Sequence, residues 1–170
     1  MYQIGDLIIY GGNGVCRVDD IGMLDIPSLE NNRLYYTLSS YYRDLKILTP
    51  VDTNVFMRSV IKYEEALELI KRIPKLDTGI YEHLDARVIK EHYHLVIESN
   101  NCLDMLQLIK NIYAKQKIVK KIGNKLTQVD EQYKKRAQEI IDEEFAIALC
   151  IQKEDVKDYI KDILKDIEMV

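Results

Sequence analysis

The hydrophobic period of the chain changes near Lys62, and this change limits the folds that the sequence can adopt. Before that point, short apolar or alternating segments recur between turn residues, which is typical of β-strands. Beyond it, apolar residues recur every three or four positions, which is typical of amphipathic helices. The sequence therefore predicts an α+β chain with a β domain at residues 1–61 and a helical domain at residues 62–170.

The first domain carries strand signals at short spacing. Leu7–Tyr10 is a compact apolar run, and Val15–Val18 is a second strand-like segment. The glycine-rich stretch 11–14 between them supplies positive-φ positions, so the two segments are predicted to form a hairpin. Further strand-like segments occupy residues 33–38, 45–49 and 55–61. Short strands at this spacing predict a small antiparallel barrel.

The second domain is predicted to hold about five helices. They cover Tyr63–Ile73, roughly Ile80–Glu98, Leu103–Val119, the residues after Thr127 and those from Val156 on. Pro74 ends the first helix. The third is apolar on more than one side, so we expect it to be the central, most buried helix. Asn101 and Thr127 are expected to cap the third and fourth helices.

Composition and the N-terminal residues indicate a soluble globular protein. Hydrophobic residues make up 47% of the chain and charged residues 31%. The N-terminus lacks the basic and apolar regions of a signal peptide, and no stretch approaches the roughly 18 apolar residues of a membrane span, so a cytoplasmic location is expected. Cys16, Cys102 and Cys150 lie far apart without metal-ligand spacing and are expected to be buried free thiols.

The polar residues do not form a recognisable catalytic set, so the chain is predicted not to be an enzyme and to need no cofactor or metal. His92 and His94 stand two positions apart in a predicted helix, where their side chains diverge, and they are interpreted as surface histidines. Gly11–Gly14 lacks the following helix and the Lys-Ser/Thr pair of a phosphate loop. The adjacent acids Asp142–Glu144 splay around a helix and are interpreted as a solvated face.

A net charge of −4 hides a strong asymmetry in the second domain. Lys110 to Arg136 holds nine basic and two acidic residues, a local charge of +7, whereas Ala137 to Val170 holds four basic and ten acidic residues, a local charge of −6. Six lysines are expected to contact nucleic-acid phosphates without sequence readout: Lys110, Lys115, Lys117, Lys120, Lys121 and Lys125. The alternative is a solvated lysine-rich face that complements a helix C-terminus.

The segment from Gln3 to Tyr10, with the glycine-rich turn after it, resembles the CarD/CdnL family of bacterial transcription regulators. Later segments are similar to the same family: 35–38, 45–50, 55–60, 126–127, 135–141 and 144–148. The resemblance implies a Tudor-like N-terminal domain that pairs edge to edge with the RNA polymerase β subunit. It also implies a helical domain near the upstream edge of the transcription bubble, which influences how long the promoter stays open.

The resemblance also implies which residues bind the polymerase. They are Lys46, Ile47, Leu48 and Thr49 on one strand, with Leu24 at a neighbouring contact position. Relatives often carry arginine where Leu24 and Leu48 stand, so a more apolar interface is expected here. Burial of both leucines in the barrel is the alternative.

The tryptophan that such relatives wedge against the DNA minor groove has no counterpart, because this chain contains no tryptophan. Ala86 stands at the corresponding position, followed by Arg87 and Lys90. Alanine is too small to fill a partly unstacked base step, so any promoter contact is expected to run through the DNA backbone and minor groove without strong sequence readout. Two functions stay open: a regulator that touches polymerase and DNA, and a polymerase-binding adaptor whose helical domain binds another protein. An enzyme built on the histidines and acids is a third.

Overall fold

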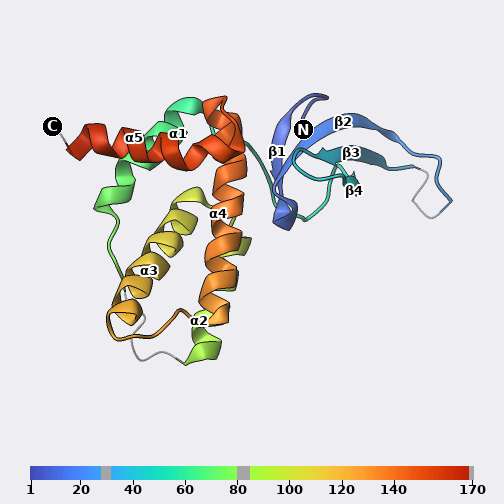
Figure 1. Cartoon of the computed structure of the whole chain (residues 1–170). Helices are drawn as coiled ribbons and strands as arrows, with labels where there is room; N and C mark the ends of the chain where they lie inside the picture. The colour runs from blue at the N-terminus through green and yellow to red at the C-terminus, as the bar shows by residue number, and fades with distance from the viewer. Residues whose placement is uncertain (28–31, 80–84, 169–170) are drawn as a thin grey trace. The chain divides into compact units, whose positions relative to one another are not determined.

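A computed structural model describes residues 1–27, 32–79 and 85–168, with side chains as far as residue 166 (Figure 1). The chain divides into two compact units, Met1–Val60 and Ile61–Val170. In the part of the chain that the structure describes, no helix is both long and apolar enough to cross a membrane.

The first unit is a five-stranded antiparallel sheet (Figure 1). Its strands are β1 (Leu7–Tyr10), β2 (Val15–Met23), β3 (Leu34–Ser40), β4 (Lys46–Pro50) and β5 (Met57–Ser59), in the order β4-β3-β2-β1-β5. The predicted hairpin of β1 and β2 is confirmed, with Ile8 opposite Cys16. Its turn contains the short 3-10 helix Gly11–Asn13, and Gly11 and Gly14 both have positive φ. A Cβ atom at Gly11 would also lie only 3.0 Å from Val55 Cγ1, so this turn requires glycine.

The core of this unit lies on one face of the sheet. Alternate residues on three adjacent strands form a buried cluster: Ile8, Tyr10, Cys16, Val18, Tyr36 and Leu38. The strand period of two places these side chains on the same face. The strands form an open sheet with β4 and β5 at its edges, so the α+β class is confirmed, whereas closure into a Tudor-like barrel is not.

The second unit contains five α-helices among the described residues, as predicted. They are α1 (Tyr63–Arg72), α2 (Ala86–Glu98), α3 (Cys102–Lys121), α4 (Gln128–Leu149) and α5 (Val156–Glu168), with 3-10 helices at Ile73–Lys75 and Lys153–Asp155. The predicted caps are confirmed: Asn101 accepts a hydrogen bond from the Asp104 amide, and Thr127 accepts one from the Asp130 amide. The first residues of the predicted second helix, 80–84, lie outside the described residues.

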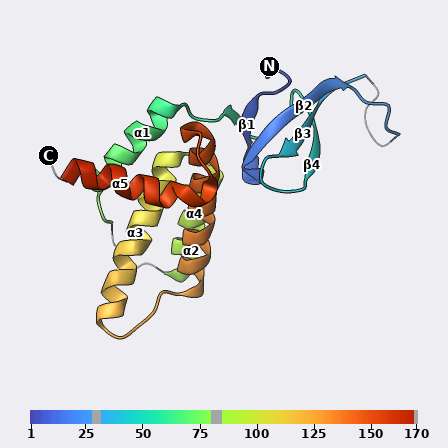
Figure 2. The ribbon, with the colours of Figure 1, turned by 45° about the horizontal axis from the view of Figure 1, so that its top comes forward.

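The central helix is α4, so the expectation that Leu103–Val119 would be the most buried segment is wrong. α4 packs against α1, α2, α3 and α5, and Figures 1 and 2 show α3 running alongside it. The buried residues of α3 end at Ile112, and its C-terminal turns are largely exposed. Apolar density along a helix cannot show which helix has neighbours on every side.

Candidate interaction surfaces

Strand β4 forms one open edge of the sheet. Its register pairs Thr37 with Leu48 and Leu38 with Ile47. In an antiparallel ladder, hydrogen-bonded residue pairs alternate with non-bonded pairs. The hydrogen bonds from Val51 N to Leu34 O and from Ser40 N to Leu45 O flank β4 and show which pairs are bonded. By that alternation Ile47 and Thr49 bond to β3, whereas the backbone groups of Lys46 and Leu48 are directed away from β3.

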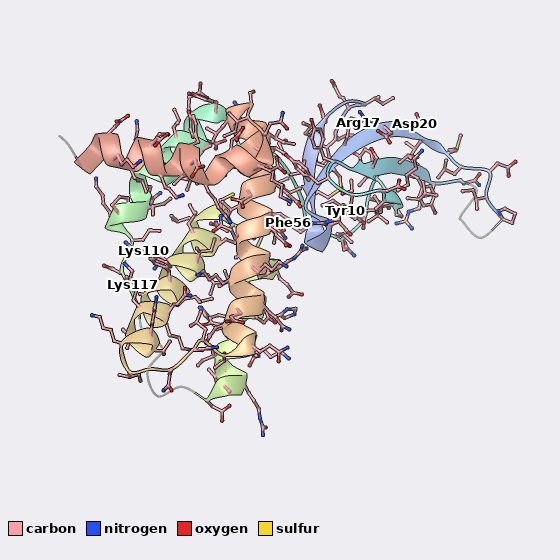
Figure 3. All side chains as sticks on the ribbon, in the orientation of Figure 1. Tyr10, Arg17, Asp20, Phe56, Lys110 and Lys117 are labelled. Atoms are coloured by element: carbon pink, nitrogen blue, oxygen red, sulfur yellow. The ribbon has the colours of Figure 1, made fainter. Side chains whose placement is uncertain are left out.

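The side chains of β4 alternate in the same way. Ile47 packs against the core cluster. Thr49 is buried and its Oγ1 accepts a 3.0 Å hydrogen bond from the hydroxyl of Tyr10, a residue labelled in Figure 3. Leu48 is 43% exposed and Lys46 is also exposed. The four residues therefore split into two that hold the strand in place and two that a partner strand can reach.

Leu24 is placed differently. It is half-buried and directly follows β2, which is separated from β4 by β3 in the sheet order. The sheet order therefore does not put Leu24 on the open edge with Leu48. Of the two leucines expected at the interface, Leu48 is the one on the edge strand.

Two of the six lysines expected at nucleic acid form hydrogen bonds within the fold. Lys110 Nζ donates to the carbonyl oxygens of Ile73, Pro74 and Leu76 at 2.9, 3.0 and 2.5 Å, which satisfies acceptors just beyond α1. Lys115 Nζ lies 2.8 Å from Asp130 Oδ2. Figure 3 labels Lys110 and Lys117, which both project from α3.

Asp130 is only 1% exposed and lies at the junction of three helices. Its carboxylate accepts hydrogen bonds from Lys115, from Tyr93 and from Thr127. Burial alone would raise the pKa of Asp130, but these hydrogen bonds outweigh it and hold the pKa below its usual range. Lys115 therefore serves as a structural counter-ion.

The other four lysines, Lys117, Lys120, Lys121 and Lys125, are exposed. Lys117 lies over the ring of Tyr113, with its Nζ atom 4.8 Å from the ring centroid. Lys120 and Lys121 stand in the last turn of α3, where cations are favourable beside the helix C-terminus. Both interpretations of the basic segment therefore keep a physical basis. The lysines are exposed enough to contact phosphates, and two of them also stabilise the C-terminus of α3.

The first turn of α2 presents Ala86, Arg87 and Lys90, all exposed. A hollow of about 420 Å³ is lined by Arg87, Lys90, Glu91, His94 and Tyr133. His94 and Tyr133 were not predicted from the sequence to lie at this surface. Arg87, Lys90 and His94 follow helical spacing and lie on one face of α2, so their grouping could have been predicted from the sequence. Tyr133 belongs to α4, and only the packing of α4 against α2 places it at this surface.

The acidic run Asp142–Glu144 is buried, so its interpretation as a solvated face is wrong. Glu144 accepts hydrogen bonds from the Ile61 amide at 3.0 Å and from Cys102 Sγ at 3.1 Å. Glu143 pairs with Lys153, and burial raises the pKa of Asp142 despite a hydrogen bond from Gln138. The central position of α4 is the reason, because neighbouring helices cover several of its faces at once.

Few other candidates for chemistry remain among the residues that the structure describes. His92 and His94 are exposed, whereas His83 lies outside the described residues. Cys16 and Cys102 are buried, but Cys150 is exposed, which corrects the expectation for that thiol. Within the described ranges, no group of three or more His, Cys, Asp or Glu side chains is arranged to hold a metal ion.

Comparison with known proteins assigns the first unit. Residues 2–61 match the family model described as the CarD-like/TRCF RID domain. This unit is therefore an RNA polymerase-interacting domain of a transcription-related protein. The match spans about a third of the chain, so it assigns this domain and not the whole protein. A search of curated proteins found no match.

Proposed function

We propose that this chain is a non-catalytic transcription regulator that binds the RNA polymerase β subunit through strand β4. Its helical unit approaches promoter DNA and modulates the stability of the open complex. The observation that carries the proposal is an open strand edge inside the domain matched to the family. Addition of a partner strand to such an edge uses backbone hydrogen bonds for affinity and exposed side chains for selectivity.

Leu48 and Lys46 supply both kinds of contact. Their backbone groups point away from β3, and their side chains are exposed on a strand held in place by Ile47 and Thr49. An apolar Leu48 favours a partner strand with an apolar residue at the facing position, since cross-strand pairs of this kind stabilise a sheet.

The DNA contact rests on the exposed cations of the helical unit. Arg87 and Lys90 on α2 and the lysines near the end of α3 are available to phosphates. Ala86 is exposed at the start of α2 but cannot act as a wedge, so the contact depends on charge rather than on base unstacking.

A polymerase-binding adaptor is the second candidate. Lys110 and Lys115 support it, because both are used within the fold and leave fewer cations for DNA than the sequence suggests. In this function the helical unit binds another protein.

The polymerase contact is tested by a pull-down of the full chain with a purified β-subunit fragment. We expect binding at micromolar concentration, and its absence would refute the proposal. The two candidates are separated by measuring affinity for forked promoter DNA over a range of salt concentrations. A steep loss of affinity with salt supports DNA contact, whereas negligible binding at every salt concentration supports the adaptor.

A further inference from the structure

Two helices build a cationic aromatic surface around Tyr113. Its side chain on α3 is 51% exposed. Lys117 from the next turn of α3 places its Nζ atom 4.8 Å from the ring centroid, and Lys134 from α4 places its own at 5.3 Å. Lys134 Nζ also donates a 2.8 Å hydrogen bond to Gln116 Oε1 of α3 at the exposed surface. Figures 1 and 2 show α3 and α4 side by side, as this arrangement requires.

We propose that Tyr113, Lys117 and Lys134 form a binding site for single-stranded DNA, in which an unpaired base stacks on Tyr113 and the lysines hold its phosphates. The inference rests on the proposed DNA contact of the helical unit and names its substrate. Proteins that bind single strands combine aromatic platforms with cations that follow the backbone. An exposed ammonium above a ring is held weakly, so it can move to a phosphate and leave the ring to a base.

A cleft between α3, α4 and α5 adds hydrogen-bonding groups for a base. It has a volume of about 460 Å³ and shares Gln116 and Lys134 with the aromatic surface. Its other charged lining residues are three acids, Glu131, Glu139 and Asp142, and two lysines, Lys135 and Lys157. With Lys134, the cleft holds as many cations as acids, and the edge of a neutral base can form hydrogen bonds there with Gln116 and Gln138.

The exposed cations near Tyr113 indicate the path of the bound DNA strand. Lys120 and Lys121 continue along α3 beyond Lys117, so a row of exposed cations extends from Tyr113 towards the end of the helix. Phosphates on either side of the stacked nucleotide can follow this row and avoid the acids of the cleft.

The test is fluorescence anisotropy of the full chain with a labelled single-stranded oligonucleotide and with the matching duplex. Tyr113→Leu should weaken single-strand binding about fivefold or more while changing duplex affinity less than twofold. Tyr113→Phe keeps the ring and should retain the affinity. Tyr63→Leu removes another exposed tyrosine of the same unit and should have no effect. Thermal unfolding of each variant checks its fold.

Each outcome decides a different question. If wild type binds both DNAs and Tyr113→Leu binds the single strand equally well, the Tyr113 site is refuted and the proposed DNA contact stands. If Tyr113→Phe loses affinity as Tyr113→Leu does, stacking is refuted. If wild type binds neither DNA, the proposed DNA contact itself fails. Competition by poly-glutamate as effective as that by the unlabelled single strand would overturn the proposal in favour of an acidic protein partner.

Discussion

The carboxylate of Asp130 joins three helices of the second unit. It accepts hydrogen bonds from Lys115 on α3, from Tyr93 on α2 and from Thr127 at the start of α4. Since Asp130 is almost fully buried, its charge is tolerated only because these donors replace water. Lys115, which was predicted from the sequence to contact nucleic acid, therefore stabilises the fold instead.

Lys115→Met should destabilise the protein, because it leaves the buried carboxylate of Asp130 without its ammonium partner. We expect a loss of about 1.5–3 kcal/mol in the free energy of unfolding at neutral pH. Lys117→Met, an exposed lysine of the same helix, should change it by less than about 0.5 kcal/mol. Urea unfolding followed by circular dichroism measures both.

The pH dependence of this effect has a definite sign. The pKa of Asp130 is lowered in the folded state, so its contribution is present above the unfolded pKa and is lost as pH falls through the folded pKa. The gap between wild type and Lys115→Met should therefore narrow in acid. A gap that stays constant down to strongly acidic pH would contradict the role of the ion pair.

Asp142→Asn should stabilise the protein at neutral pH. Burial raises the pKa of Asp142, so the ionised form costs folding free energy at neutral pH, and this cost disappears as pH falls below the unfolded pKa of about 3.9. Asparagine stays neutral and its oxygen can still accept the hydrogen bond from Gln138. The unfolding midpoint in urea should rise at pH near 7, and this gain should fade towards pH 4.

The control for this substitution is Asp158→Asn. Asp158 is exposed, and its hydrogen bond with Lys161 lowers the pKa of its carboxyl, so no gain is expected at neutral pH. If Asp142→Asn were destabilising at neutral pH, attraction between Asp142 and the nearby Lys153 and Lys157 would outweigh the cost of burial.

At the scale of the element, strand β4 is hydrogen-bonded to β3 along one side and, among the described residues, has no partner strand along the other. The alternation of an antiparallel ladder assigns the amide of Leu48 to the open side. Proline is tolerated on an edge strand when its missing N–H would have pointed away from the sheet. The backbone donor can therefore be removed at this position without breaking the pairing with β3.

Leu48→Pro should bind the polymerase β fragment about five- to tenfold more weakly than Leu48→Ala, the size expected for one lost hydrogen bond. Both variants lack the leucine side chain, so the difference between them reports the backbone donor. Titration calorimetry with the purified fragment measures the affinities. Equal affinities of two variants that both remain folded would argue against strand addition at β4.

At the scale of the whole molecule, the charge that reaches the surface differs from the charge along the sequence. The basic stretch loses Lys110 and Lys115 to internal contacts, and the acidic stretch loses Asp142, Glu143 and Glu144 to burial. The two opposite charges counted from the sequence are therefore both weaker on the surface of the helical unit. Cations remain exposed at the end of α3, on α2 and on α4.

The sequence by itself determined the local features of this protein. The change of hydrophobic period separated strands from helices, glycines marked the first hairpin, and Asn101 and Thr127 marked two helix starts. It also carried a resemblance to a known family, which the family match confirms for residues 2–61. These features depend on spacing and backbone preference within a few residues, which a sequence records directly.

Only the tertiary structure decided which charged residues are exposed and can contact a partner. Asp142–Glu144 follow the pattern of a solvated face but lie in the helix that has neighbours on several sides. Lys115 and Lys117 are alike in sequence, yet one meets a buried carboxylate and the other covers an aromatic ring. The free energy of a charge depends on the groups that pack around it, and those groups come from helices far away in the chain.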